Sequence, residues 1–147
     1  MEYAANYGAD WRKEIETWLR NELNHDAFNP VRASEEFLGS QYPGLDFRET
    51  KLNDFEMHKE IAREIVRLDS REIILRSDYV ICYYDESAQR GAGTKGELTV
   101  AALLGKPVYF VRGMEIADIP SWVIGCADHI FDDFDQLKKF LSEKYSD

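Results

Sequence analysis

The sequence predicts an α/β protein whose sheet is mostly parallel and doubly wound, with helices on both faces. Apolar runs of strand length, such as residues 79–84 and 107–111, alternate with longer stretches whose apolar residues recur at helical spacing. Each run is separated from the next by a segment long enough for a helix, and such connections join parallel strands. With 147 residues the chain can bury a core of its own, and we expect a single domain over residues 1–147.

The first half of the chain is expected to be mainly helical, with a long irregular segment in its middle. In chain order the expected elements are a helix from Asp10 to about Leu23, a short strand at Ala27–Phe28 ended by Asn29-Pro30, a loop over residues 32–53, a helix from about Asp54, and a shorter helical segment over residues 69–76.

The second half alternates more regularly. The expected elements are a strand over residues 79–84, a small-residue loop over 87–93, a helix opened by Thr94 and stopped by Gly105, a strand over 107–111, a short helix opened by Pro120, a minor strand at His129–Phe131, and a last helix capped by Asp132 or Asp133.

Composition excludes several classes of partner. The formal net charge of −10 argues against nucleic acid or an anionic membrane as the main partner. No stretch has the apolar length of a membrane span, and no signal peptide opens the chain. Cys82 and Cys126 lack metal-like spacing and are expected to be reduced packing residues of a cytoplasmic protein, and the three histidines are scattered, so we expect no metal site.

The residues around the predicted strand 79–84 indicate a small-ligand site. Asp85 ends this strand, and Gly93, Thr94 and Glu97 open the helix that follows. Ligands of open α/β sheets bind beyond the carboxyl ends of the strands, where these residues fall. The alternative is structural, because Thr94 and Glu97 also fit a capping box. Composition alone favours the cap, whereas the loop over residues 87–93, which lets the backbone approach a ligand, favours the site.

The same segment resembles the nucleoside 2-deoxyribosyltransferase family, which includes deoxynucleoside 5′-monophosphate N-glycosidases. The matching motifs are Tyr84-Asp85, Gly93-Thr94-Lys95-Gly96-Glu97 and Gly105-Lys106-Pro107-Val108, with Asp69 at the place of an earlier family aspartate. The resemblance is specific over residues 69–111 and loose elsewhere. It implies a flavodoxin- or Rossmann-like fold.

One departure from the family concerns the start of the sheet. Family members begin with an apolar strand that lies in the middle of the sheet, whereas this chain begins Met1-Glu2-Tyr3-Ala4-Ala5. We therefore expect the first strand to be short or missing. A sheet without its central strand leaves backbone groups unpaired, which is costly.

The resemblance also implies roles for individual residues. Glu97 would be the nucleophile, kept ionised by a helix N-terminus. Asp69 would be the acid/base, although a helix cap is an equally good interpretation of that residue. Asp85 would bind a sugar hydroxyl or orient the loop, and Gly93 would line the substrate site. Tyr3 is a candidate for stacking on the base.

A phosphate group on the substrate is a further possibility. Arg90, Thr94 and Lys95 surround the predicted loop, and a helix start favours anions. The alternative is that Arg90 and Lys95 are solvated loop charges.

The expected activity is cleavage of the N-glycosidic bond of a 2′-deoxynucleoside and transfer of the deoxyribose to another free base, without metal or organic cofactor. Family members commonly form homo-oligomers, so at least a dimer is expected. Hydrolysis of a deoxynucleoside 5′-monophosphate is one alternative. A non-catalytic nucleotide-binding module and a purely structural domain are the others, and Gly91, which stands where some relatives have an acid, favours these slightly.

Overall fold

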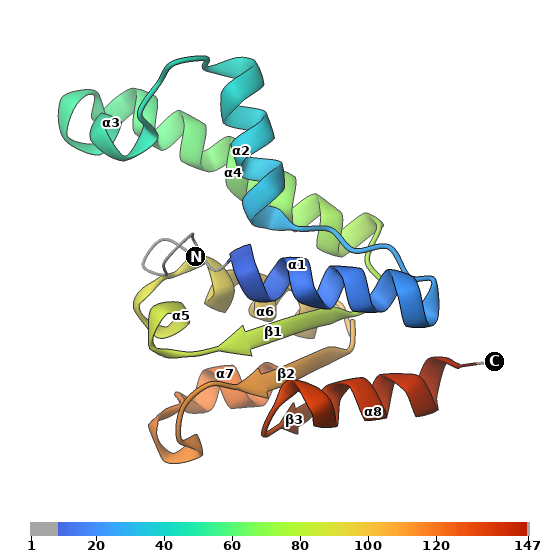
Figure 1. Cartoon of the computed structure of the whole chain (residues 1–147). Helices are drawn as coiled ribbons and strands as arrows, with labels where there is room; N and C mark the ends of the chain where they lie inside the picture. Colours follow the sequence, from blue (N-terminus) through green and yellow to red (C-terminus); the bar gives the residue numbers. More distant parts are fainter. Residues whose placement is uncertain (1–8, 147) are drawn as a thin grey trace.

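The structure is a computed structural model that describes residues 9–146, and its centre is a parallel sheet with helices on both faces (Figure 1). Among these residues the sheet has three strands in the order β1 (Val80–Tyr84), β2 (Val108–Arg112) and β3 (His129–Phe131). Val80 lies opposite Val108, and Tyr109 lies opposite His129. The predicted α/β class and the parallel sheet are confirmed.

Helices account for most of the remaining chain. They are α1 (Ala9–Trp18), the π-helical turn η2 (Leu19–Leu23), α2 (Pro30–Gln41), α3 (Phe47–Asn53), α4 (Phe55–Leu75), α5 (Glu86–Arg90), α6 (Gly93–Leu103), the 3-10 turn η3 (Ile116–Asp118), α7 (Ser121–Cys126) and α8 (Phe134–Tyr145).

Two apolar clusters hold the helices to the sheet, one on each face. Side chains alternate between the faces of a strand, so neighbouring strand residues belong to different clusters. Tyr109 and Val111 pack with α1, η2 and α8. Cys82, Tyr84 and Phe110 pack on the other face against the end of α4, α5, α6 and α7. We call the strands and these packed helices the sheet body.

A helical arm projects from the sheet body, and it consists of α2, α3 and the first half of α4 (residues 30–64; Figure 1). Its helices begin at strong caps: Asn29 accepts from the backbone N–H of Val31 at 3.0 Å, and Asp46 and Asp54 cap α3 and α4 in the same way. Packing contributes less, because α2 has no buried residue.

The arm corrects several predictions. Residues 32–53 are not a long loop, because they contain most of α2 and all of α3. Ala27–Phe28 is not a strand but part of the irregular link to α2. The pair Asn29-Pro30, taken as a strand end, is instead a helix start, with the proline at the first helical position. The separate segment over residues 69–76 is the end of the continuous helix α4.

The predicted signals at Gly105 and Asp133 locate the end of α6 and the start of α8 correctly. Gly105 follows α6 with a φ of 70°, the left-handed conformation that glycine adopts without strain. Asp133 accepts from the backbone N–H of Gln136 at 2.8 Å and caps α8. Gly113 is needed for another reason, because a Cβ there would lie 2.7 Å from the Tyr83 ring.

Candidate functional site

A cleft of about 900 Å³ runs along the edge of β1 that has no partner strand among residues 9–146. Residues of α1 and η2 form one wall, and residues of α4 and α6 form the other. Its volume falls in the range of about 300–1,000 Å³ that is usual for small-ligand sites. The carboxyl end of the cleft, where ligands of α/β sheets bind, is lined by Arg12, Asp69, Thr94 and Glu97.

An acid pair lies at this end. Asp69 is on α4 and Glu97 is on α6, and their carboxyl groups are hydrogen-bonded to one another. Such a bond requires a proton on one of the two. The buried Oδ1 of Asp69 has no N–H or O–H donor among the described residues. The pair therefore has capacity for a further hydrogen bond from a ligand.

Burial makes both acids harder to ionise. Burial, together with the negative charge of Asp69, raises the pKa of Glu97 to about 7, while Arg12 opposes the shift. Burial also raises the pKa of Asp69 to about 6, while the hydrogen bond from Glu97 and the charge of Arg12 oppose that shift. The two acids titrate as a unit, and between their pKa values, slightly below neutral pH, they share about one proton, held chiefly by Glu97.

The prediction that a helix N-terminus keeps Glu97 ionised is therefore wrong, because the pKa of Glu97 is raised and not lowered. Glu97 is the fifth residue of α6, which begins at Gly93, and the helix dipole weakens beyond the first turn. Burial and the neighbouring Asp69 outweigh it.

Neither acid is a helix cap. The N-cap of α6 is Ala92, which makes no side-chain cap hydrogen bond, and Thr94 lies inside the helix, so the capping-box alternative is wrong. Asp69 lies within α4, well before its end at Leu75, which excludes the N-cap alternative for that residue as well. Helix capping therefore does not explain why Asp69 and Glu97 occupy buried positions.

Arg12 is the charged residue that sequence reasoning missed. It reaches the acid pair from α1 across the end of the cleft, and its guanidinium carbon lies 4.6 Å from the centre of the Trp11 ring. Burial lowers the pKa of Arg12, while Glu97, Cys82, Asp69 and Asp85 raise it. Its only sequence signal was its place in the first turn of the helix predicted from Asp10.

The other predicted site residues are more scattered. Asp85 caps α5, accepting from the backbone N–H of Ala88 at 2.9 Å, so it orients the segment after β1. Because α5 occupies most of residues 87–93, the predicted loop is reduced to the link between two helices. Gly93 begins α6, and a Cβ on it would meet no atom within 4 Å, so close packing does not require glycine there.

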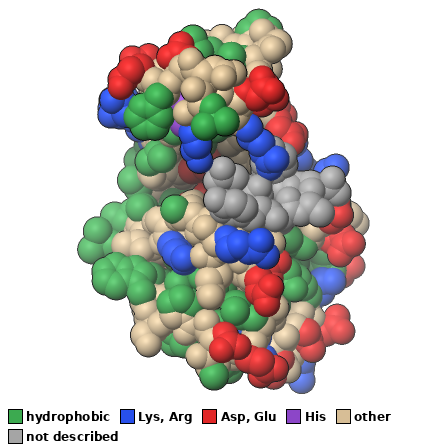
Figure 2. Space-filling model, turned by 90° about the vertical axis from the view of Figure 1, so that its left-hand side faces the viewer, with side chains coloured by type: hydrophobic (Ala, Val, Ile, Leu, Met, Phe, Trp, Pro, Cys, Tyr) green, Lys and Arg blue, Asp and Glu red, His purple; other side chains and the backbone are tan. Residues whose placement is uncertain are grey.

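The two candidate phosphate ligands do not line the cleft. Arg90 is exposed at the end of α5, and Lys95 Nζ donates to the backbone oxygen of Gln89 at 2.6 Å. Thr94 does line the cleft. Tyr3 lies outside the described residues. Figure 2, which views the carboxyl end of the sheet, shows Lys and Arg side chains gathered where the arm joins the sheet body.

Aromatic residues near the carboxyl end divide between cleft and core. Trp11 and Tyr83 line the cleft and contact each other with ring centroids 6.1 Å apart. Tyr84 is fully buried, and its ring stacks on that of Phe110 with the two centroids 5.4 Å apart. Tyr84 is therefore a core residue. Burial strongly raises the pKa of the Cys82 thiol, which also lines the cleft.

Residues 9–146 contain no group of three or more His, Cys, Asp or Glu side chains arranged to hold a metal ion. In the same part of the chain, no helix combines the length and apolar character needed to cross a membrane. Comparison with known proteins found no match: no family model, no curated protein and no solved structure is similar to this chain.

Proposed function

We propose that this protein cleaves the N-glycosidic bond of a 2′-deoxynucleoside and transfers the deoxyribose to another base, using no metal or organic cofactor. The observation that carries the proposal is the buried acid pair, Asp69 and Glu97, at the carboxyl end of β1 in a cleft large enough for a nucleoside. A pair that shares one proton supplies one carboxylate and one carboxylic acid, the two groups that glycosidic cleavage with retention requires.

The chemistry would proceed in two displacements. The Glu97 carboxylate attacks the anomeric carbon, a glycosyl ester forms, and the bond from carbon to base breaks as Asp69 gives its proton to the leaving nitrogen. A nitrogen of the second base then attacks the same carbon, the ester breaks, and that base's N–H proton passes to Asp69. Water in place of the second base would give hydrolysis.

Because Glu97 holds most of the shared proton in the free protein, it must first lose it. The hydrogen bond between the two acids provides a direct route to Asp69. Arg12 favours the ionised form of both acids, so it reduces the cost of forming the carboxylate. We therefore assign Arg12 a positioning and electrostatic role.

Release of free base from purified protein tests this function. Purine and pyrimidine 2′-deoxynucleosides are incubated with and without a second base, and products are separated by chromatography. Glu97→Gln and Asp69→Asn should each lower turnover by more than about a hundredfold, since they remove nucleophilic or acid catalysis. Ribonucleosides should react at least about tenfold more slowly, a barrier difference of about 1.4 kcal/mol.

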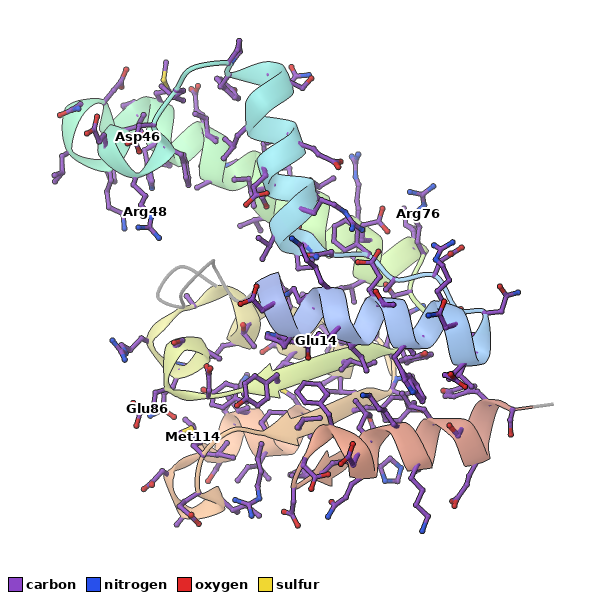
Figure 3. The ribbon with its side chains drawn as sticks, in the orientation of Figure 1. Glu14, Asp46, Arg48, Arg76, Glu86 and Met114 are labelled. Atoms are coloured by element: carbon purple, nitrogen blue, oxygen red, sulfur yellow. The ribbon has the colours of Figure 1, made fainter. Side chains whose placement is uncertain are left out.

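The matched control is Glu86→Gln, an equal change in charge at the same end of the sheet. Glu86 is exposed and points away from the sheet body (Figure 3). Its turnover should equal that of the unaltered protein. Nucleoside binding without any base release would instead favour the non-catalytic nucleotide-binding module, and an active Glu97→Gln variant would rule out Glu97 as nucleophile.

A second candidate, hydrolysis of a deoxynucleoside 5′-monophosphate, is favoured by the basic side chains at the junction of arm and body (Figure 2). Arg48 of α3 points from the arm toward this region (Figure 3). Changing both Arg90 and Lys95 to Ala tests the two cations on the body side. Charge-assisted contacts of about 1.5–3 kcal/mol each would raise the KM for monophosphates more than tenfold and leave nucleosides unaffected. An unchanged KM means that both are solvated charges.

We also propose that the protein is a homo-oligomer joined through the arm. The arm exposes Leu52, Phe55 and Met57, an apolar set that a second copy of the same surface would cover. Light scattering should give the mass of a dimer or a larger oligomer, and Leu52→Glu should lower it. A monomer at all concentrations would contradict this proposal.

A further inference from the structure

Three arginines follow one line along the outer face of α4. Arg63, Arg67 and Arg71 stand four positions apart, so they lie on successive turns of the helix, and all three are exposed. None of their side chains has a hydrogen bond or an ion pair with another residue of 9–146. Like charges at this spacing repel one another, and the net charge of the chain is −10. An acidic protein therefore keeps a line of positive charge without contacting acids.

The acids of α4 lie toward the arm or toward the cleft. Glu60 and Glu64 belong to the arm half of the helix, where Glu64 accepts from the hydroxyl of Tyr42 at 3.2 Å. Glu72 lines the cleft and pairs with Arg76, and the acid pair lies in the cleft as well. From residue 65 to the end of α4, and throughout α6 and α7, no acidic side chain is exposed. The surface of this part of the molecule is therefore basic.

Exposed apolar side chains lie on the same three helices. Helix α6 packs against α4 on one side and against α7 on the other, over one face of the sheet (Figure 1). Val66 and Ile74 of α4 are exposed, Leu103 of α6 is 85% exposed, and Trp122 of α7 is 70% exposed. The indole Nε1 of Trp122 donates to Thr99 Oγ1 at 2.9 Å, which holds the ring beside α6 without burying it. Exposed apolar residues of this size, above all tryptophan, are typical of protein–protein contacts.

The two kinds of residue are ordered as in a helix that pairs with another helix. Val66, Ser70 and Ile74 recur at every fourth residue, beside the line of arginines. An apolar line with charges along its flank selects a partner helix with an apolar stripe and opposite charges. A flat anionic lipid surface fits less well, because Glu60 and Glu64 continue the exposed face of α4 toward the arm. A twofold contact with a second copy would bring two lines of arginines together.

We propose that α4, α6 and α7 form a docking face for an acidic amphipathic helix of a partner protein. The apolar stripe of that helix would cover Val66, Ile74, Leu103 and Trp122. Its acids, three or four residues apart, would pair with the three arginines of α4. This face is separate from the cleft and from the exposed apolar set of the arm, so the inference does not rest on the proposed function.

A labelled helical peptide tests the docking face on the whole chain. The probe is acetyl-Gln-Leu-Glu-Gln-Ala-Leu-Glu-Gln-Leu-Glu-Gln-Ala-Leu-Glu-Gln-Leu-Gln-amide, whose leucines form one stripe and whose glutamates form a line beside it. Fluorescence anisotropy should show saturable binding. Replacing every glutamate with lysine should weaken binding more than tenfold, and this difference should shrink at high salt. No saturable binding up to about 1 mM, or equal affinity of the two peptides, would overturn the proposal.

Substitutions in the protein locate the binding site. Arg67→Glu combined with Arg71→Glu should weaken binding of the probe more than tenfold, and so should Trp122→Ala. All three side chains are exposed, and urea unfolding checks that the fold is kept. The matched control combines Lys13→Glu with Lys139→Glu, an equal change in charge on α1 and α8, which cover the other face of the sheet. The control should bind as the unaltered protein does, and an equal loss in the control would overturn the assignment of this face.

Two further measurements distinguish other occupants of the face. Sedimentation with vesicles of phosphatidylcholine and phosphatidylserine should leave the protein in solution. Vesicle binding that Arg67→Glu with Arg71→Glu abolishes would assign the face to a membrane. Light scattering should give Trp122→Ala the same mass as the unaltered protein, and a lower mass would show that a second copy covers the face. Either of these two results would overturn the partner helix, and neither measurement depends on base release.

Discussion

In the sheet body, Leu98, Phe110 and Leu137 are at most 1% exposed, whereas in the helical arm Leu52 is 89% exposed and α2 has no buried residue. The body combines segments far apart in the chain, and buried apolar area stabilises it. The arm depends on caps and on short-range contacts, such as the ring of Phe47 stacked 4.4 Å from that of His58. Asp46, labelled in Figure 3, caps one of these short helices.

The difference indicates how the two regions divide their tasks. A rigid, packed body can hold two buried acids in fixed positions, because many contacts resist their separation. An arm with exposed apolar side chains retains surface for a partner and tolerates local opening. Substitutions of matched chemistry in the two regions measure this contrast.

The largest expected effect is that of a core truncation in the body. Phe110→Ala removes a fully buried ring that packs on Tyr84, and it should lower the free energy of unfolding by about 3–5 kcal/mol. Phe55→Ala makes the same change in the arm, where the ring is 60% exposed. It should cost no more than about 0.5 kcal/mol. Urea unfolding measures both, and equal losses would refute the contrast.

The acid pair should make the body less stable as pH rises. Since burial raises the pKa of Glu97 from 4.5 to about 7, the folded state holds a proton that the unfolded state loses. Its contribution is complete below about pH 4.5 and is lost as pH rises through 7. Glu97→Gln should remove most of this dependence and stabilise the protein at pH 8 by about 3 kcal/mol.

Unfolding of the two proteins at several pH values between 5 and 8 provides the measurement. Asp69, with its raised pKa, contributes in the same direction and leaves a smaller slope in the variant. Glu86→Gln should keep the slope of the unaltered protein. A parallel pair of curves for Glu97→Gln and the unaltered protein would show that Glu97 is not buried as a neutral acid.

Removal of a helix cap in the arm should have an effect of intermediate size on the free energy of unfolding. Asn29 is 6% exposed and accepts from the backbone N–H groups of Val31 and Arg32. Asn29→Ala should cost about 1 kcal/mol. The loss should appear first as faster amide exchange in α2, while exchange in β2 stays unchanged. Equal acceleration in both would mean that arm and body unfold together.

The smallest effect is expected at the most exposed apolar residue. Leu52→Ala should change the free energy of unfolding of a dilute sample by less than about 0.5 kcal/mol, because the side chain has little contact to lose. The same measurement at high protein concentration sharpens the comparison. If copies join through the arm, the variant should then be the less stable protein.

Sequence reasoning succeeded where signals were local. Gly105 ends α6 and Asp133 caps α8 as predicted, and the strand over residues 129–131 lies where expected. It failed over residues 32–53, where charged and polar residues gave no apolar periodicity strong enough to indicate α2 and α3. Asn29-Pro30 carried the missing signal, which fits a strand end and a helix start equally well.

Sequence reasoning identified only part of the candidate site, because the remainder depends on contacts between distant segments. Asp69 and Glu97 stand 28 positions apart, and they became candidates through the resemblance to the deoxyribosyltransferase family and, for Glu97, through its position after a predicted strand. Their contact depends on the packing of α4 against α6, which no local pattern records. Arg12 comes from yet another element, so its approach to the pair follows from tertiary structure alone. The sign of the Glu97 pKa shift likewise depends on burial.

Among residues 9–146 the outer edge of β1 has no partner strand, and partial opening of the flanking helices would expose it to other molecules. Exposed strand edges are templates for aggregation, and like charge is one of the features that keep them apart. This chain has a net charge of −10 at pH 7 but an isoelectric point of about 4.8. Acidification toward pH 5 therefore protonates the acid pair, which favours the folded state, while it removes the repulsion between molecules. We expect these two effects of acidification to oppose each other.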